Sequence, residues 1–447
     1  MPRVLTRAGR ALERAIGAEV HGGEWRLVGV FFANLFLLLT AYYILKVIRE
    51  PLILLSGGAV ERSYARGLQA GLLVLLIPLY GLMANRFEPA RLVKWIMGVF
   101  VVCVMAFVLL AQLGVPVGFA FFVWLGIFST LSIAQFWSLA NDVMTESEGK
   151  RLFPLVAVGG TVGGIGGAQI AARLISSLSP FNLMLIAAGI MVGCAFLTHA
   201  THGVEASHRA RVPDGVRKER DPRGGFTLVV SDRYLLLIAL AVLILNFVNT
   251  TGDFVLAELV STRAKSLPLA EQRAFIGAFY GDYQTYISVL TAVVQIFLVA
   301  RAFKFLGIGG SLLFLPIFAV VGYGAAALVP LLALVSTVKV VENSTDYSLQ
   351  STIQQALFLP TSRDAKYKAK AAIDTLFVRL GDLASTGLVF VGAQAGMTVF
   401  GYALSNLLVS VAWIWIAVRL RQLNASASSP AKAEPASAGA AVATAHE

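Results

Sequence analysis

Several ionisable and amide side chains of this chain lie within long apolar runs, where an uncompensated charge is costly. In the first run, Asn34, Tyr42, Lys46 and Arg49 follow one another at steps of eight, four and three residues, with Glu50 directly after them. These steps keep the four side chains near one face of a helix. A charged side chain at the centre of a bilayer-spanning helix costs about 2.5 to 3.5 kcal/mol on insertion scales, so each is a candidate for a paired or cavity-lining role.

Four later apolar runs carry similar groups. The polar residues in them are Asn246, Asn249, Thr250 and Asp253; Tyr280, Asp282, Tyr283, Gln284 and Tyr286; Lys339, Glu342, Asn343, Asp346 and Tyr347; and Lys370, Asp374, Arg379 and Asp382. Lys339 and Glu342 are three residues apart, and so are Arg379 and Asp382. This spacing predicts an ion pair within one helix in each case, with a structural or gating role.

Three further cations, Lys46, Arg49 and Lys370, exceed what one structural ion pair requires. Such an excess of positive charge near cavity-lining spans favours an anionic ligand, held by point charges and by hydrogen bonds from tyrosine or asparagine. The residues predicted to contact this ligand are Lys46, Arg49, Lys370, Tyr42, Asn249, Asp253 and Tyr283.

The elements that must position these residues are membrane-spanning helices. Of the 447 residues, 57% are hydrophobic and only 14% are charged, and the mean hydropathy is +0.76, so the chain is far more apolar than a soluble protein. A transmembrane barrel is excluded because the apolar residues form unbroken runs and do not alternate with polar ones. At about 20 residues per span, the length allows about a dozen spans.

Twelve apolar runs are found, in two groups of six. They are 27–48, 67–84, 93–113, 117–140, 153–177 and 181–200, then 234–256, 274–300, 307–326, 328–349, 371–394 and 398–418. The predicted units are a cytoplasmic N-terminal segment (1–26), a six-helix bundle (27–200), a basic cytoplasmic linker (201–233), a second six-helix bundle (234–420) and a disordered cytoplasmic tail (421–447). This all-α, polytopic layout is that of the major facilitator architecture, with a substrate site between the halves.

The net charge of +11 indicates orientation in the membrane. Basic clusters at the N-terminus, in the linker and in alternate short loops fall on one side if the spans alternate, so both termini are predicted to be cytoplasmic. Arg62 and Arg66, in the loop expected after the first span, are exceptions. This distribution removes nucleic acid as a partner and leaves the lipid bilayer and an anionic ligand. The absence of a serine-rich leader favours a bacterial inner membrane, and the oligomeric state stays open, a monomer being plausible.

No motif indicates catalysis, a cofactor or a metal site. Cys103 and Cys194 are too few for a disulfide framework or a four-ligand metal site, and the histidines lie outside the span centres. Gly159, Gly163 and Gly167 recur at steps of four. They predict close helix packing and not a phosphate loop, because no lysine-serine or lysine-threonine pair follows at the required spacing. The chain is therefore predicted not to be an enzyme.

Three separated motifs resemble those of the ATP/ADP translocase family, the nucleotide transporters of plastids and obligate intracellular bacteria. The first is residues 44–50 (Ile-Leu-Lys-Val-Ile-Arg-Glu). The second is residues 136–142 (Phe-Trp-Ser-Leu-Ala-Asn-Asp), followed by residues 150–155 (Lys-Arg-Leu-Phe-Pro-Leu). The third is Tyr-Ser-Leu at 347–349, followed by residues 368–374 (Lys-Ala-Lys-Ala-Ala-Ile-Asp). The motifs come in the family's order and cover most of the chain.

The resemblance implies secondary transport of nucleotides by alternating access, either as proton-independent exchange of ATP for ADP or as proton-coupled import. It places Arg49 and Lys370 at two functional lysines of the family. Two acidic positions of the family fall on Leu125 and Asn249, so the chain departs from the family there. Asp253, one turn beyond Asn249, is a candidate replacement.

Three hypotheses follow. A nucleotide carrier would hold the phosphates with the three cations and stack the base on an aromatic residue such as Tyr42, Tyr283 or Trp137. The same fold could carry another organic anion or phosphate compound, which the two missing carboxylates favour. A non-transporting membrane receptor or scaffold is the alternative of another class, and the polar stripes of the first, seventh and tenth runs count against it.

Overall fold

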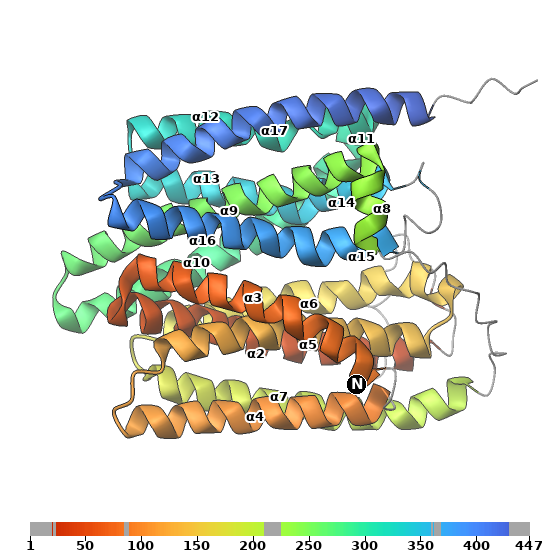
Figure 1. Cartoon of the computed structure of the whole chain (residues 1–447). Coiled ribbons are helices and arrows are strands. Elements are labelled where there is room, and N and C mark those ends of the chain that lie inside the picture. The colour runs from red at the N-terminus through yellow and green to blue at the C-terminus, as the bar shows by residue number, and fades with distance from the viewer. Residues whose placement is uncertain are drawn as a thin grey trace, which may run out of the picture.

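The computed structural model describes residues 20, 24–84, 89–209, 225–358, 361 and 368–428, and within them all regular secondary structure is helical (Figure 1). The first half consists of α2 (Trp25–Ser56), α3 (Gly58–Ala84), α4 (Pro89–Gln112), α5 (Gly118–Val143), α6 (Glu146–Leu174) and α7 (Pro180–Arg209). The second half begins with α8 (Gly225–Ser231), α9 (Arg233–Lys265), α10 (Leu269–Val293), η1 (Val294–Leu298), α11 (Val299–Ser311) and α12 (Phe314–Leu328). It ends with α13 (Leu332–Thr345), η2 (Asp346–Gln350), α14 (Ser351–Leu357), α15 (Lys370–Ala372), η4 (Ile373–Phe377), α16 (Val378–Gln394) and α17 (Val399–Ser428).

Each of the twelve predicted spans corresponds to one helical segment, if helices joined through a π-helical (η) turn are counted together. Nine of the described helices are long and apolar enough to cross a membrane, and α3, α12 and α13 with α14 are not among them. α12 has only 15 residues, and α13 carries buried charges. The chain is thus a multi-pass integral membrane protein.

Several predicted boundaries differ from the structure. α3 begins at Gly58, nine residues before the apolar run that predicted it, so Arg62 and Arg66 lie in a helix and not in a loop. α12 begins at Phe314 instead of residue 307, because α11, which is kinked at Gly307, continues to Ser311 and a turn at 312–313 follows it. α17 continues to Ser428, inside the tail that was predicted to be disordered from residue 421.

The linker predicted at 201–233 is also partly helical. α7 extends into it as far as Arg209, and α8 occupies 225–231. Residues 210–224 lie outside the described residues, as do most of the N-terminal segment 1–26 and the last 19 residues of the tail. The predictions for those stretches stay predictions.

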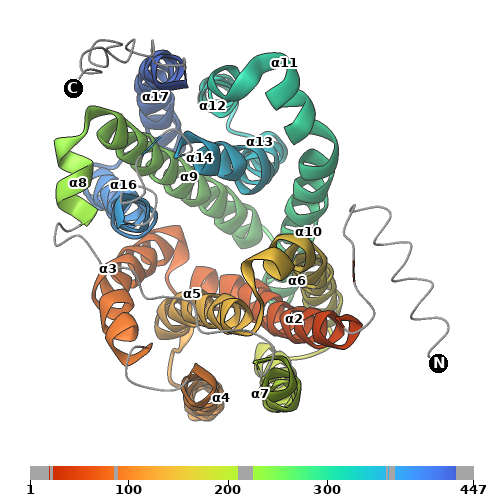
Figure 2. The same ribbon diagram turned by 90° about the vertical axis from the view of Figure 1, so that its right-hand side faces the viewer.

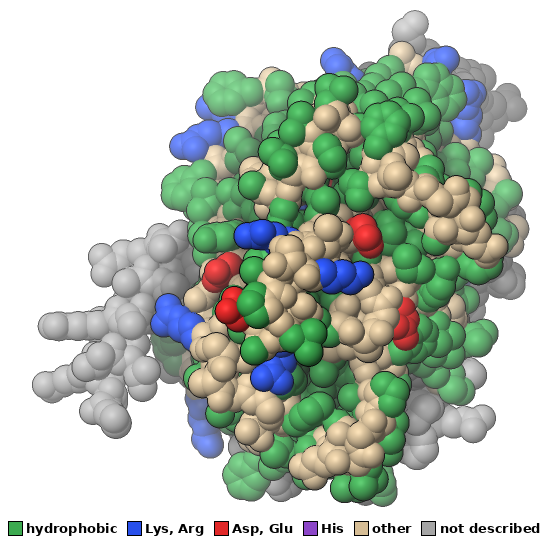
Figure 3. All heavy atoms as spheres, turned by 90° about the vertical axis from the view of Figure 1, so that its left-hand side faces the viewer, with side chains coloured by type: hydrophobic (Ala, Val, Ile, Leu, Met, Phe, Trp, Pro, Cys, Tyr) green, Lys and Arg blue, Asp and Glu red, His purple; other side chains and the backbone are tan. Residues whose placement is uncertain are grey.

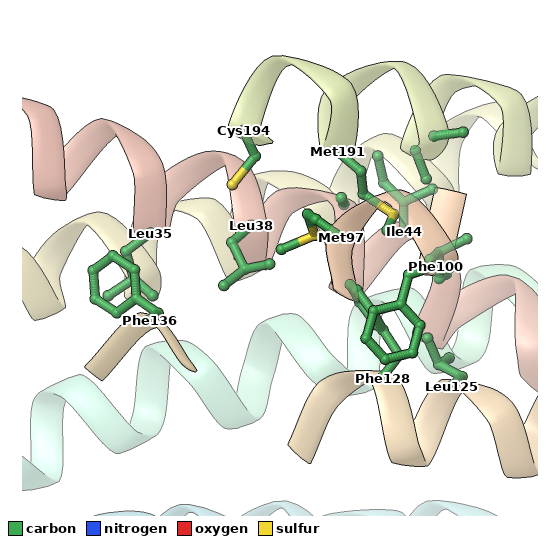
Figure 4. Close-up of a cluster of buried hydrophobic side chains, with 14 of the residues drawn as sticks. Leu35, Leu38, Ile44, Met97, Phe100, Leu125, Phe128, Phe136, Met191 and Cys194 are labelled. Carbon is green, nitrogen blue, oxygen red and sulfur yellow. The ribbon is translucent and has the colours of Figure 1, made fainter. Parts of the chain in front are cut away.

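The two halves lie side by side, which is seen most clearly in the view along the helix axes (Figure 2). Each half has its own apolar core. In the first half, residues such as Leu38, Ile44, Phe128 and Met191 from α2, α5 and α7 pack together (Figure 4). The halves meet where α3 contacts α9 and α16, and where α10 contacts α2 and α6.

Close packing of α2 on α6 depends on glycine. A Cβ added at Gly159, Gly163 or Gly167 would come within 3.0 Å of a backbone atom of α2, because these glycines lie directly against the carbonyl oxygens of Phe32, Phe36 and Thr40. Small residues allow two membrane helices to approach this closely. The prediction that the glycine run serves helix packing is confirmed.

Local sequence sets several helix ends. Thr145 precedes α6 and forms a capping box with Glu148: each side chain bonds the other residue's backbone N–H. The side chain of Asp232 accepts hydrogen bonds from two backbone N–H groups at the start of α9. Gly114 and Gly396 have positive φ values in the turns after α4 and α16, a conformation that glycine adopts without strain. These ends fix where each helix begins or stops around the site.

Among the elements of the second half that the structure describes completely, three π-helical turns interrupt helices. They are η1 after α10, η2 after α13 and η4 before α16. The described part of the first half has none. Such turns occur frequently at functional sites, and η1 and η2 both contribute a side chain to the cavity that lies between the halves.

Candidate functional site

A cavity of about 380 Å³ lies between the two halves. Its lining residues are Leu35, Leu39 and Tyr43 of α2; Ile133 and Trp137 of α5; Ala157, Gly160, Thr161 and Gly164 of α6; Ile287, Ser288, Thr291 and Ala292 of α10; Gln295 of η1; and Tyr347 of η2. A mainly apolar wall with a few polar groups, in a volume of about 300 to 1,000 Å³, is typical of small-molecule sites. Because both halves contribute to the wall, a movement of one half against the other would change its opening.

This cavity lies in the part of the bundle that is nearer to the first and last residues that the structure describes. Leu35 is ten residues after the start of α2, and Trp137 is six residues before the end of α5. Since successive helices are antiparallel, these two helix ends lie on the same side of the bundle (Figure 1). Lys46, Arg49 and Glu50 of α2 lie about three to four turns beyond Leu35, toward the opposite side.

A smaller cavity of about 50 Å³ continues from the inner end of the first, and Ile287 and Tyr347 line both. Its charged lining consists of Lys46, Arg49, Arg62 and Arg66 together with Glu50 and Asp253. Four cations face two carboxylates, which leaves an excess of two positive charges in the wall.

Lys46 is the cation of this wall that no described carboxylate neutralises. Its Nζ donates a hydrogen bond to Oε1 of Gln284, on α10 of the other half, at 2.9 Å. The ammonium also lies 5.8 Å from the ring centroid of Tyr42 and 5.2 Å from that of Tyr43, within the range of cation–π attraction. Its positive charge is therefore available to an anion in the cavity.

Arg49 is held differently. It belongs to a buried triad in which Glu50 lies between two arginines, with its Oε1 2.6 Å from Arg49 and its Oε2 2.6 Å from Arg62. The Arg49 guanidinium also stacks on Phe122, 4.0 Å from the ring centroid. All three charged side chains are less than a tenth exposed. Arg49 lines the small cavity, as predicted, but in this conformation its charge is compensated by Glu50.

A second network centres on Asp253. Oδ2 of Asp253 lies 3.0 Å from Arg66, and Oδ1 lies 3.3 Å from the ammonium of Lys339. Lys339 also lies 3.3 Å from Glu342, as its spacing predicted, and donates to Oδ1 of Asn249 at 2.6 Å. Asn249 and Asp253 are thus brought together, but around a lysine of their own half rather than in the wall of the large cavity.

The contacts between Arg66 and α9 join the two halves. Arg66 bonds Asp253 and the hydroxyl of Thr250, at 3.0 and 3.2 Å, and Arg62 donates to the backbone oxygen of Asp253 at 3.5 Å. An apolar cluster that includes Ile53 and Phe254 packs around them from both halves. At the end opposite to the termini, side chains fill the centre of the face, with acidic and basic groups set among apolar ones (Figure 3). The bundle is therefore closed on this side.

The remaining predicted charges lie away from the large cavity. Arg379 and Asp382 form their predicted ion pair at 3.2 Å, and Asp382 also accepts a hydrogen bond from Thr250 at 2.6 Å. Lys370 lies 2.5 Å from Asp374, one turn along the same helix, and Asp374 is 43% exposed. Lys370 lines neither of the two cavities, so its predicted contact with the ligand stays a prediction.

The aromatic candidates are closer to the site. Trp137 and Tyr43 both line the large cavity, and Tyr283 lines the small one, where its hydroxyl accepts a hydrogen bond from Asn343 at 2.8 Å. Leu125, where the family has a carboxylate, is fully buried in the apolar core of the first half (Figure 4).

Sequence reasoning missed Arg62, Arg66 and Tyr43 as site residues. Arg62 and Arg66 are four residues apart, which is a helical spacing, and they follow a helix-breaking Gly57-Gly58 pair. This spacing was the available signal for an earlier helix start. Tyr43 directly follows Tyr42, which was predicted to contact the ligand. Only the packing of the neighbouring helices decides which of the two rings enters the cavity.

The described residues hold no group of three or more histidine, cysteine, aspartate or glutamate side chains that could bind a metal ion. Cys194 is buried and Cys103 is partly buried, and neither forms a disulfide. The side chains of His199, His202 and His208 lie outside the described set.

Comparison with solved structures finds transporters. An inward-facing bacterial homologue of the iron transporter ferroportin superposes with a TM-score of 0.65 at 11% identity, covering 89% of this chain and 98% of the other. The nucleoside transporter NupG gives 0.62 at 12% identity, covering 88% and 98%. An inward-facing bacterial homologue of the lysosomal transporter Spinster gives 0.56 at 14% identity, covering 92% and 98%. At these identities the similarity shows the fold, which is the one that the two six-helix halves predicted.

Comparison with curated sequences finds two carriers. ADP,ATP carrier protein 1 of Chlamydia muridarum (strain MoPn / Nigg) is 24% identical over 333 residues, which cover 64% of this chain and 61% of the carrier. ADP,ATP carrier protein 1 of Chlamydia trachomatis serovar D gives the same values. The chain therefore spans about three fifths of the length of the carriers it matches. No family model matches it. The resemblance predicted from the three motifs is confirmed by these two matches.

Proposed function

We propose that this chain, a relative of the ADP,ATP carriers with the fold of secondary transporters, moves nucleotides across a membrane by alternating access between its two halves. The observation that carries the proposal is Lys46. It is a cation that no carboxylate among the described residues neutralises, at the closed end of a cavity that both halves line. An anion entering this cavity would gain a charge-assisted hydrogen bond there.

The two parts of a nucleotide suit the two ends of the cavity. The phosphates would lie at the inner end, against Lys46 and the excess positive charge of the small cavity. The base would lie further out, against Trp137 and Tyr43, where stacking on an aromatic ring is favourable. Both sequence relatives are named as ADP,ATP carriers, which supports a nucleotide over other organic anions.

The conformation supports alternating access. The ion pair between Arg66 and Asp253 and the apolar cluster around it close one end of the bundle, and the cavity lies toward the other. Two of the similar solved structures are also inward-facing. With both termini in the cytoplasm, as the distribution of basic residues predicts, this conformation would open to the cytoplasm of a bacterial cell. Entry of substrate from the other side would require the Arg66 contacts to break.

A second candidate is a carrier of another phosphate compound. It is favoured by Leu125 and Asn249, because the former is buried in an apolar core and the latter is engaged by Lys339. Neither position offers the carboxylate that the ATP/ADP translocases have. Asp253 is the nearest carboxylate to Asn249 in the chain, and it is held by Arg66 and Lys339.

The test is exchange in proteoliposomes. Purified protein, reconstituted with internal ADP, should take up labelled external ATP, and the assay is run with and without a proton gradient. Lys46→Gln should raise the apparent KM for ATP by about 10- to 150-fold, because a hydrogen bond to a charged group contributes about 1.5 to 3 kcal/mol. Lys304→Gln is the matched control, since Lys304 is an exposed lysine of α11 that lines neither cavity.

Two results would contradict the proposal. The first is a folded preparation that exchanges no nucleotide; uptake of inorganic phosphate or a sugar phosphate by the same vesicles would then establish the second candidate. The second is an unchanged KM in Lys46→Gln, which would remove Lys46 from the binding site even if exchange occurs. Arg49→Gln and Lys370→Gln, measured in parallel, test the two positions that the family resemblance selects.

A further inference from the structure

The ammonium group of Lys339 is surrounded by oxygen atoms as a bound cation would be. Its Nζ lies 3.0 Å from the backbone oxygen of Asn249 and 2.6 Å from Oδ1 of the same residue. It lies 3.3 Å from Oδ1 of Asp253 and 3.3 Å from Oε2 of Glu342. Two carboxylates, an amide and a backbone carbonyl are the oxygen ligands that hard metal cations prefer in proteins.

Most of this group of oxygens is enclosed, and Asp253, which also lines the small cavity, is 16% exposed. The side chain of Lys339 has no exposed surface, and Glu342 is 3% exposed. Tyr323 closes one side, and its hydroxyl donates to Oε2 of Glu342 at 2.6 Å. Gly252 closes another, because it packs against Tyr323 and the aliphatic part of Lys339. The ammonium group of Lys339 therefore lies in the interior of the protein and is not a surface charge.

Charge balance sets the kind of cation. The network contains two cations, Arg66 and Lys339, and two carboxylates, Asp253 and Glu342. Removing the charge of Lys339 would leave one uncompensated negative charge, which one monovalent cation would neutralise. A buried charge without a partner is strongly destabilising, so the demand for such an ion would be large.

One ligand atom is still unused. Oε1 of Glu342 is buried and has no hydrogen-bond partner in the described structure. It belongs to the same carboxyl group as the oxygen that contacts Lys339. A metal cation could be bound by both oxygens of this carboxylate, whereas the single ammonium is in contact with only one of them.

We infer that Asn249, Asp253 and Glu342 form a monovalent-cation site that is permanently occupied by the tethered ammonium of Lys339. Transport by this chain then requires no exchangeable sodium or other metal cation at this position, whatever the substrate of the large cavity is. The site also bears on the contact between the halves, because Asp253 holds Lys339 through Oδ1 and Arg66 through Oδ2. A cation at this position would hold the Asp253 carboxylate, which Arg66 of α3 binds, in place.

The test removes the tether and supplies the free ion. Lys339→Ala is purified as the full chain in detergent, and its Tm and its monodispersity in size-exclusion chromatography are measured in ammonium chloride, sodium chloride and choline chloride at equal ionic strength. Ammonium chloride or sodium chloride should raise the Tm of Lys339→Ala saturably by several degrees over choline chloride, because only the small ions fit the vacated position. The wild-type protein should show no such difference.

Two control variants keep the experiment decisive. Lys370→Ala removes a lysine from another lysine–carboxylate pair, at an exposed position, and should not respond to the small cations. Lys339→Ala combined with Glu342→Gln restores charge balance and should fold in choline chloride with the cation response reduced at least tenfold in affinity. The proposal is overturned if Lys339→Ala is no better folded or no more stable in either small cation than in choline, or if a control variant responds equally.

Discussion

The ion pair between Arg66 and Asp253 offers a direct test of how the two halves are held together. Arg66→Gln removes the charge and leaves a shorter, neutral polar side chain. Asp253 keeps its contact with Lys339 at 3.3 Å, although Lys339 then faces two carboxylates, Asp253 and Glu342. What is lost is the ion pair at 3.0 Å between side chains that are 23% and 16% exposed, and the hydrogen bond from Arg66 to Thr250 at 3.2 Å, both on the closed side of the bundle.

The magnitude follows from this geometry. A hydrogen bond to a charged group contributes about 1.5 to 3 kcal/mol, and the partial exposure of both side chains places this pair in the lower part of that range. A loss of about 2 kcal/mol from the closed conformation alone raises the relative population of the alternative conformation by about 30-fold. The substitution should act on the conformational equilibrium and leave the apolar cores of both halves intact.

Cysteine labelling measures this population. The chain has only two cysteines, so Cys103→Ser and Cys194→Ser give a background in which Ser288→Cys places one thiol in the wall of the large cavity. The labelling rate by a membrane-impermeant maleimide from the side opposite to the termini should rise about 30-fold when Arg66→Gln is added, since labelling from this side requires the minor conformation.

Arg379→Gln is the matched control for this measurement. Arg379 pairs with Asp382 at 3.2 Å, and these side chains are 18% and 11% exposed, but both belong to α16. Removing this pair changes nothing across the halves, so the labelling rate should stay within about twofold of the background. The reasoning is refuted if Arg66→Gln also stays within twofold, or if the two variants accelerate labelling equally.

Two other predictions concern packing and the base. Gly163→Val should destabilise the protein by about 1 to 3 kcal/mol, seen as a lower Tm, because its Cβ would overlap the carbonyl of Phe36. Gly166→Ala, where an added Cβ meets nothing within 4 Å, should be nearly neutral, and equal effects would show that the contact is not limiting. Trp137→Ala should weaken transport of ATP about tenfold, since stacking on a base contributes about 1 to 3 kcal/mol, and should leave transport of a phosphate compound without a ring unchanged. Equal losses for both substrates would remove Trp137 from contact with the base.

The all-helical fold with many apolar helices and the packing role of the glycine run could be predicted because each depends on local sequence. An unbroken apolar run predicts a span wherever it occurs, and glycines at steps of four lie on one helix face regardless of what packs there. The same is true of the pairs Lys339–Glu342 and Arg379–Asp382, whose partners are three residues apart.

The partners of Arg62 and Arg66 could not be predicted in this way. Their charges shortened the apolar run of α3, so both were assigned to a loop. In the structure Glu50 and Asp253 compensate them from other helices. A charge is tolerated in a span when a distant residue neutralises it, and local hydropathy cannot reveal that residue.

The difference between Lys46 and Arg49 has a similar origin. Both lie near one face of α2 and both were predicted to bind the ligand. Glu50 and Phe122 engage Arg49, whereas Gln284 is the hydrogen-bond partner of Lys46. Which of two neighbouring cations is left for a ligand depends on how α5 and α10 pack around α2.

The π-helical turns of the second half change how its helical faces are counted. Each such turn contains one residue more than an α-helical turn, and one residue corresponds to about 100° of rotation. In the helix formed by α13, η2 and α14, the residues after Gln350 are therefore rotated by that amount relative to Lys339 and Glu342, compared with a continuous α-helix. Deleting one residue within η2 would restore regular α-helical geometry and leave α14 facing the same neighbours. An alignment of this chain with an α-helical relative should accordingly place a single-residue gap inside that span, where gaps are ordinarily excluded.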